Sequence, residues 1–357
     1  MDQEIGDEFR IGIMNIKKET IVEDLQPYML CILSNILFAG YTIVSKVCLD
    51  GGMSRYVLAV YAHAFGTMAT ALLALLLERK QATKISLQIL RNAFFNGLVG
   101  GVLARTLYFA GLEYTSATVG SAMSNLIPPI TFVLAVLCRM EKIEIGSRIA
   151  QAKIWGTCIS FGGATLITLY KGAVLIAPLS THSHHIQAAA KHLTYIDWIK
   201  GSIMLFVSSL STAFFYILQA VTVKKYPAPL TLTSLMCLFA TLLGAIFTAI
   251  IDREASSWRL SWDITLLAPL YSGILVFGVT IYLQTLAVRM KGPVFITAFG
   301  PLSTLIVAIV GLFILGEALH LGDVIGAVLI VGGLYAVLWG KEKEKQKKLL
   351  LDLPTAS

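Results

Sequence analysis

Charged residues are scarce in this sequence. Only 14% of its 357 residues are Asp, Glu, Lys or Arg, whereas 56% are hydrophobic and the mean hydropathy is +0.76. Soluble domains carry about 25% charged and about 45–50% apolar residues. The composition therefore argues against a soluble enzyme, a nucleic-acid-binding protein and a secreted disulfide scaffold, and it predicts a membrane protein.

Sequence patterns for catalysis, metal binding and ATP use are also missing. The five cysteines show no Cys-x-x-Cys spacing, which argues against a disulfide framework and a zinc site. The chain contains no Gly-x4-Gly-Lys-Ser/Thr loop and no His-Glu-x-x-His pair. We interpret the four histidines of segment 171–200 as part of a solvated loop rather than as metal ligands. No enzyme, metal or cofactor is therefore expected, and an intramembrane enzyme or a receptor is the alternative of a different class.

Long apolar runs without charge make up most of the chain. An α-helix rises 1.5 Å per residue and the hydrocarbon layer is about 30 Å thick, so a run of about 17–26 residues can cross it. Each run should be helical, because backbone groups cannot stay unpaired in lipid. The ten candidate spans are residues 25–45, 56–77, 92–112, 114–138, 154–170, 201–223, 226–251, 264–288, 292–316 and 324–340, of which the third is interrupted only by Arg105.

The basic residues outside these runs predict the orientation of the bundle. If the N-terminus is cytoplasmic, 20 of the 28 Lys and Arg residues fall on the cytoplasmic side and seven on the outer side. An excess of Lys and Arg marks cytoplasmic loops. Both termini are therefore predicted to be cytoplasmic, and we attribute the net charge of +7 to topology rather than to nucleic-acid binding.

The two halves of the chain share a pattern of glycines. The motif Gly156-x5-Gly-Gly in the fifth run recurs as Gly326-x5-Gly-Gly in the tenth. A unit with an odd number of spans places its second copy in the opposite orientation. The predicted fold is thus an all-α polytopic membrane protein whose ten helices form two inverted five-helix repeats. Its segments are a cytoplasmic N-terminal segment 1–27, a first repeat 28–170, an outer loop 171–200, a second repeat 201–340 and a basic cytoplasmic tail 341–357.

Several stretches resemble a known plant family. They are Leu107-Tyr-Phe-Ala-Gly-Leu-Glu-Tyr-Thr-Ser-Ala-Thr118, Ala122-Met-Ser-Asn-Leu-Ile-Pro-Pro-Ile-Thr-Phe132, Arg139-Met-Glu-Lys142, Ala152-Lys153, Leu169-Tyr-Lys-Gly172 and Gly333-Leu-Tyr-Ala-Val-Leu-Trp-Gly-Lys341. Together they resemble the nodulin-like, "walls are thin"-related group of the drug/metabolite transporter superfamily, which includes the "usually multiple acids move in and out" transporters. The resemblance covers roughly residues 27 to 345.

This resemblance implies two EamA-type repeats and a carrier of amino acids or related small organic acids such as auxin. It also implies the plasma membrane, with the vacuolar membrane as the alternative. The chain departs from the family in two places, because members often carry Arg where it has Ala62, and Gln-Asn where it has Arg105 and Thr106. A basic group lost from the second span and one gained in the third suggest that the charge has been relocated.

Arg105 is the strongest candidate for a binding residue. An Arg near the middle of a span costs about 2.5–3.5 kcal/mol on insertion scales, and its planar guanidinium suits a carboxylate. Tyr108 follows three residues later on the same helix face. We expect these two side chains to hold the carboxylate of a substrate, and a purely structural pairing of Arg105 is the alternative.

Other polar side chains inside the spans are expected to line the pathway, or else to join helices by hydrogen bonds. His63 is the only histidine inside a span and can titrate near neutral pH; a satisfied buried histidine is the alternative. A stripe on one face of the sixth span contains Ser209, Thr212, Tyr216 and Gln219. The remaining candidates are Asn35, Asn125, Tyr282 and Gln284.

Three prolines lie inside spans rather than at their ends, namely Pro128, Pro129 and Pro301. A proline removes a backbone donor and clashes with the carbonyl four residues earlier. We therefore expect kinks at equivalent points of both repeats, which would serve as hinges beside the substrate.

These observations predict a secondary transporter that exposes a central cavity alternately to each side. No Asp or Glu lies within the charge-free runs, so facilitated or exchange transport is favoured over proton coupling. A phosphorylated-sugar or nucleotide-sugar exchanger of the same superfamily is the alternative, although a phosphate needs several inward-facing Lys or Arg. Expected partners are a small-molecule substrate and the lipid bilayer, but no nucleic acid. The spacing Gly97-x3-Gly101 permits either a homodimer face or close packing within the bundle.

Overall fold

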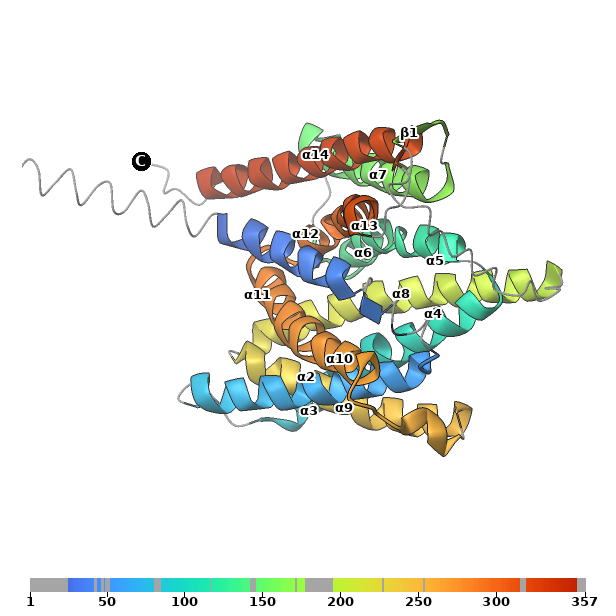
Figure 1. The fold of residues 1–357 in the computed structure, drawn as a ribbon. Helices are drawn as coiled ribbons and strands as arrows, with labels where there is room; N and C mark the ends of the chain where they lie inside the picture. The colour runs from blue at the N-terminus through green and yellow to red at the C-terminus, as the bar shows by residue number, and fades with distance from the viewer. Residues whose placement is uncertain are drawn as a thin grey trace, which may run out of the picture.

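The computed structural model is a bundle of helices (Figure 1). Each predicted apolar run is helical over most of its described length. The structure describes residues 25–41, 44–45, 48, 52–79, 85–115, 117–141, 146–170, 172–176, 195–226, 228–252, 254–314 and 319–351. The four histidines of the outer loop and both predicted terminal segments, apart from residues 25–27 and 341–351, lie outside the described residues.

Consecutive helices account for nearly all of these residues. The first half contains the helix Leu25–Tyr41, α2 (Arg55–Leu77), α3 (Leu87–Asn96), η1 (Gly97–Leu103), α4 (Ala104–Glu113), α5 (Ala117–Ser124), α6 (Ile127–Leu137) and α7 (Arg148–Leu169). The second half contains α8 (Tyr195–Lys225), α9 (Pro229–Ile251), η2 (Ala255–Trp258), α10 (Ile264–Tyr271), η3 (Ser272–Thr280), α11 (Ile281–Lys291), α12 (Pro293–Ala298), α13 (Gly300–Ile314) and α14 (Leu321–Leu351). One antiparallel pair joins β1 (Val174–Ile176) to β2 (Leu319–His320).

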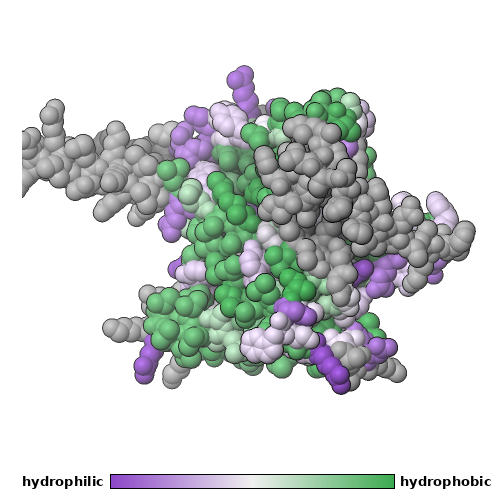
Figure 2. Space-filling model, in the orientation of Figure 1, coloured by the Kyte–Doolittle hydropathy of each residue, from purple (hydrophilic) through white to green (hydrophobic). Residues whose placement is uncertain are grey.

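The bundle has the surface of a membrane protein. Six helical stretches are long and apolar enough to cross a bilayer, and three shorter apolar helices accompany them. On the face drawn in Figure 2, a broad hydrophobic surface lies between hydrophilic residues that gather toward its two ends. Many large apolar side chains on α2 and α9 are exposed, among them Met68, Leu72 and Ile246. We conclude that the chain is a polytopic membrane protein.

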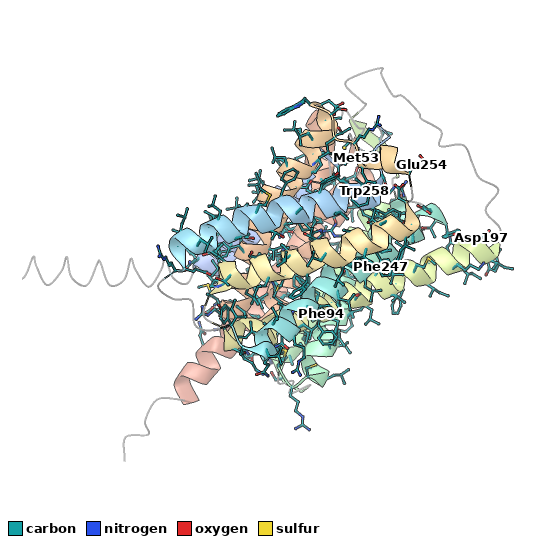
Figure 3. All side chains as sticks on the ribbon, turned by 90° about the horizontal axis from the view of Figure 1, so that it is seen from below. Met53, Phe94, Asp197, Phe247, Glu254 and Trp258 are labelled. Carbon is teal, nitrogen blue, oxygen red and sulfur yellow. The ribbon has the colours of Figure 1, made fainter. Side chains whose placement is uncertain are left out.

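Both described ends of the chain lie on the same side of the bundle (Figure 1). The helix Leu25–Tyr41 begins on this side and α14 ends there, so we call it the tail end. Met53, Asp197, Glu254 and Trp258 lie toward the opposite side (Figure 3), which we call the Trp258 end. An even number of membrane crossings produces this arrangement.

The largest buried apolar cluster closes the tail end. It joins Cys31, Tyr226 and Phe295 with neighbours from α3, α9 and α11. Beside it, the buried carboxylate of Glu78 accepts hydrogen bonds of 2.8 Å from the backbone N–H groups of Leu230 and Thr231. A carboxylate at a helix N-terminus satisfies unpaired N–H groups and interacts favourably with the helix dipole. The end of α2 is thereby fixed to the start of α9.

Two of the long helices contain π-helical segments. η1 separates α3 from α4, and η3 separates α10 from α11. Both segments pack closely on a neighbour through glycine: a Cβ added to Gly97 would lie 2.9 Å from the Met236 carbonyl oxygen, and one added to Gly273 would lie 2.6 Å from that of Ala62. A Cβ on Gly101 would clash with Ala240. The Gly97-x3-Gly101 motif therefore packs against α9 within the bundle and is not an open homodimer face.

The two proline-containing spans are interrupted rather than simply kinked. In the first half α5 ends at Ser124 and α6 begins at Ile127, so Pro128 lies in the first turn of α6. In the second half α12 ends at Ala298 and Pro301 lies in the first turn of α13. A proline is tolerated there, because the first N–H groups of a helix have no intrahelical partner. The break therefore falls just before each proline.

The helices that carry the repeated glycine motif pack against each other antiparallel. A Cβ on Gly156 of α7 would lie 2.6 Å from the Gly333 carbonyl oxygen of α14, and one on Gly163 would lie 2.7 Å from that of Gly326. The first glycine of each motif thus contacts the last glycine of the other. Such a crosswise contact is what a twofold relation between two copies in opposite orientation produces.

Both ends of this α7–α14 pair are fastened. At the tail end, the Lys153 ammonium lies 3.2 Å from a Glu141 carboxylate oxygen and 2.5 Å from one of Glu344, and Lys341 also pairs with Glu141. At the other end, β1 follows α7 and pairs with β2, which precedes α14.

Candidate functional site

Arg105 lies inside the bundle, where η1 passes into α4. Its Cζ atom is 5.6 Å from the ring centre of Tyr41 and 5.2 Å from that of Phe277, which is within the range of a cation–π interaction. Its Nη1 atom lies 3.4 Å from the Tyr41 hydroxyl. No described Asp or Glu forms an ion pair with Arg105, and Glu113 is exposed. The guanidinium is thus positioned by aromatic rings, and its charge is available to an anion.

His63 shares one of these rings with Arg105. The centres of the His63 and Phe277 rings are 3.9 Å apart. The Nδ1 atom of His63 lies 2.7 Å from the Ala59 carbonyl oxygen, one turn earlier on α2. Only 4% of the His63 residue surface is exposed. The histidine is therefore held in one orientation beside Arg105.

Three polar residues named from the sequence surround this centre. Tyr216 and Tyr108 are both close enough to Arg105 to interact with its charge. Tyr216 also pairs with the Gln284 side chain, and Tyr108 pairs with Ser124 beside the break between α5 and α6. The structure thus brings Arg105, Tyr108, Tyr216 and Gln284 together around one point.

Two buried amides lie close to this group and keep unused hydrogen-bonding capacity. The Gln219 side chain donates a hydrogen bond of 2.8 Å to Thr285, which leaves its oxygen without a partner among the described residues. Asn125 lies at the break before Pro128, and its side-chain nitrogen has no described partner. Buried amide groups are normally paired, so both are open to a ligand or a water.

Two predicted residues have other environments. Asn35 donates a hydrogen bond of 2.7 Å to the Cys31 carbonyl oxygen of its own helix. Tyr282 lies near the Glu78 carboxylate toward the tail end. Among the described residues neither of them contacts Arg105, so these two do not join the central group.

A small cleft leads from Arg105 toward the Trp258 end. It is lined by α2, by η1 and α4, and by α9, with Tyr56, His63, Gly101, Arg105, Gly244 and Thr248 among its residues. The cleft offers about 20 Å³ to the centre of a water-sized sphere, which is room for one or two waters. In this conformation the site therefore excludes a substrate of amino-acid size.

Sequence reasoning missed the rings that hold Arg105. Tyr41 and Phe277 occur in apolar runs that are rich in aromatic residues, and nothing in their spacing marks them. Glu78 was also missed, because it follows an apolar run directly and resembles an ordinary loop residue. The partners of all three residues are distant in sequence, so only the tertiary structure reveals them.

Comparison with known proteins matches both halves of the chain to the same family. Residues 25–169 and 199–339 each match the model of the EamA-like transporter family. A WAT1-related protein of Arabidopsis thaliana is 43% identical over 337 residues, which cover 92% of this chain and 84% of that protein. A second one is 40% identical over 319 residues, which cover 89% of this chain and 80% of that protein.

The fold is also similar to that of a protein whose crystal structure is known. It aligns with a TM-score of 0.66 over 89% of this chain and 98% of that chain. The two sequences are 14% identical, so this similarity concerns the fold alone.

Proposed function

Because this chain belongs to the EamA-like transporter family and to its WAT1-related plant members, we propose that it is a secondary transporter of amino acids or related small organic acids such as auxin. Membership confirms the resemblance seen in the sequence. It also makes the chain a membrane transporter with a small-molecule substrate.

The architecture that we propose is a set of ten spans arranged as two inverted repeats. Three observations support it: the family model matches twice, the equivalent glycines of α7 and α14 contact each other crosswise, and the third span of each half contains a π-helical segment. Inverted repeats with interrupted helices are typical of secondary transporters, whose substrates bind between the halves.

The choice of substrate class rests on one observation, the environment of Arg105. A half-buried guanidinium without a described carboxylate partner, beside Tyr41, Tyr108 and Tyr216, offers charge-assisted hydrogen bonds to an anion. One positive charge suits a carboxylate better than a phosphate ester, which carries more charge. We therefore favour amino acids and organic acids over phosphorylated sugars.

Alternating access is supported by the difference between the two ends of the bundle. The tail end is closed by the cluster around Tyr226, whereas the cleft reaches the site from the Trp258 end. The charge distribution of the loops leads us to propose that the tail end is cytoplasmic. The resemblance to the family leads us to propose the plasma membrane, with the vacuolar membrane as the alternative.

The test is transport of labelled amino acids and indole-3-acetate in oocytes. We expect Arg105→Ala to reduce transport by about tenfold or more, since a hydrogen bond to a charged group contributes about 1.5–3 kcal/mol. Arg91→Ala is the matched control, because Arg91 is exposed at the end of the same long helix.

Surface labelling must show equal amounts of both variants in the membrane. Transport of a carboxylate at the wild-type rate by Arg105→Ala would remove Arg105 from the site. Flux of phosphorylated sugars but of no carboxylate would instead favour the exchanger.

A further inference from the structure

His63 presents an unused hydrogen-bond acceptor beside Arg105. A carbonyl oxygen can only accept, so the 2.7 Å contact with Ala59 requires that the proton is on Nδ1. In an uncharged imidazole the other nitrogen, Nε2, then carries a lone pair. A second positive charge next to the Arg105 guanidinium would be repelled in a poorly solvated site. The uncharged ring, with Nε2 as an acceptor, is therefore the form that fits this position.

The Nε2 atom faces the cleft. A Cβ added to Gly101 would lie 3.5 Å from it, and His63, Gly101 and Arg105 line the same cleft. No hydrogen bond from a described residue reaches this nitrogen, and stacking on Phe277 prevents the ring from turning freely. Hydrogen-bond donors of Arg105 and an acceptor of His63 thus face the same cleft.

We propose that His63 is a specificity-determining residue that accepts a hydrogen bond from an N–H group of the substrate while Arg105 holds its carboxylate. This inference rests on the proposed function and narrows it. The site selects carboxylates that also carry an N–H donor, such as the ammonium group of an amino acid or the ring N–H of an indole acid. Because the cleft has room only for one or two waters in this conformation, the helices that line it must separate before such a molecule enters.

Matched pairs of compounds test this proposal. One pair is indole-3-acetate and 1-methylindole-3-acetate; the other is alanine and its N,N,N-trimethyl betaine. Each pair keeps the carboxylate, and only the first member has the N–H group. For the pair whose parent is carried, we expect wild-type kcat/KM to be about tenfold or more higher for the parent, because an unpaired donor or acceptor in a buried site is costly.

Variants of His63 test whether this side chain accepts the hydrogen bond from the substrate N–H group. His63→Phe keeps a ring to stack on Phe277 but has no acceptor, so the ratio between the two compounds should fall to about one. His63→Gln keeps an acceptor and should retain a preference for the parent. A general loss of packing would lower both rates and leave their ratio unchanged.

Three outcomes would overturn the proposal. Equal wild-type transport of the parent and the methylated compound shows that the protein does not recognise the N–H group. This result does not depend on the folding of a variant. An unchanged ratio in His63→Phe assigns the selectivity elsewhere while the proposed function stands. Absence of flux for every carboxylate in the wild-type protein rejects the proposed function and this inference together.

Discussion

Arg105 and Ala62 adjoin the same aromatic ring. Ala62 belongs to the buried cluster of Phe277, and the Arg105 guanidinium lies over that ring. The resemblance to the family implies an Arg at position 62 in many members and none at position 105. The two positions are in different spans, yet both place a basic group beside Phe277. The relocation suggested by the sequence is therefore between two positions that lie beside the same ring.

An exchange of the two positions tests this relocation. Arg105→Gln should lower carboxylate transport by about tenfold or more, whereas the double variant Ala62→Arg with Arg105→Gln should recover a large part of it. Uptake of the same labelled acids measures both effects. If the double variant reaches the membrane and transports no better than Arg105→Gln, the positions are not interchangeable.

The helix contacts explain why each repeated motif has two adjacent glycines. A Cβ on Gly163 or Gly333 would meet backbone atoms of the partner helix at less than 3 Å, whereas nothing lies within 4 Å of a Cβ on Gly162 or Gly332. Only the second glycine of each pair is thus required for the contact between α7 and α14. The first faces open space, where lipid would lie.

Alanine substitutions separate these two roles. Gly163→Ala should destabilise the protein by about 1–3 kcal/mol, the usual effect of overpacking a close contact. Gly162→Ala, its neighbour on the same helix, should be neutral or slightly stabilising, because Ala is the better helix former. Thermal unfolding in detergent followed by size-exclusion chromatography compares them. Equal midpoints for the two variants would contradict the contact seen here.

The sequence predicted the helices but not their irregularities. Charge-free runs located the long helices of the described part of the chain, and the glycine motifs predicted that the fifth and tenth are equivalent. The π-helical segments η1 and η3 were not predicted, because a shift of hydrogen-bond partner leaves no mark in composition. The prolines showed where the spans would be irregular, and the helices are interrupted for one or two residues just before them. In the candidate site, polarity marked Arg105 and His63 as candidates, whereas aromatic partners such as Phe277 have no such signal.

The whole molecule is asymmetric across the membrane despite its two similar halves. Val223 belongs to the apolar cluster at the tail end and is 1% exposed, whereas Tyr56 lines the cleft toward the Trp258 end. A transporter with alternating access must reverse this asymmetry in its other state. The present conformation is thus closed at the tail end.

Thiol labelling from each side of the membrane measures this reversal. In a background with Cys138 and Cys158, the two exposed cysteines, replaced by Ser, Tyr56→Cys should react with an impermeant reagent added outside. Val223→Cys should react only with reagent on the cytoplasmic side. Conditions that increase the labelling rate of Tyr56→Cys should decrease the labelling rate of Val223→Cys. Reaction of both cysteines from the same side would contradict the proposed topology.

The contacts between α7 and α14 have a consequence for how the protein changes conformation. Ion pairs hold the two helices together at one end, and a pair of strands holds them at the other. Between these ends the glycines allow close backbone contact. One helix from each of the two halves that match the family model thus forms a pair that we expect to move as one unit. We expect the proposed movement to occur in the remaining helices, with the α7–α14 pair as a fixed support. A carrier built in this way is expected to change shape around the α7–α14 pair.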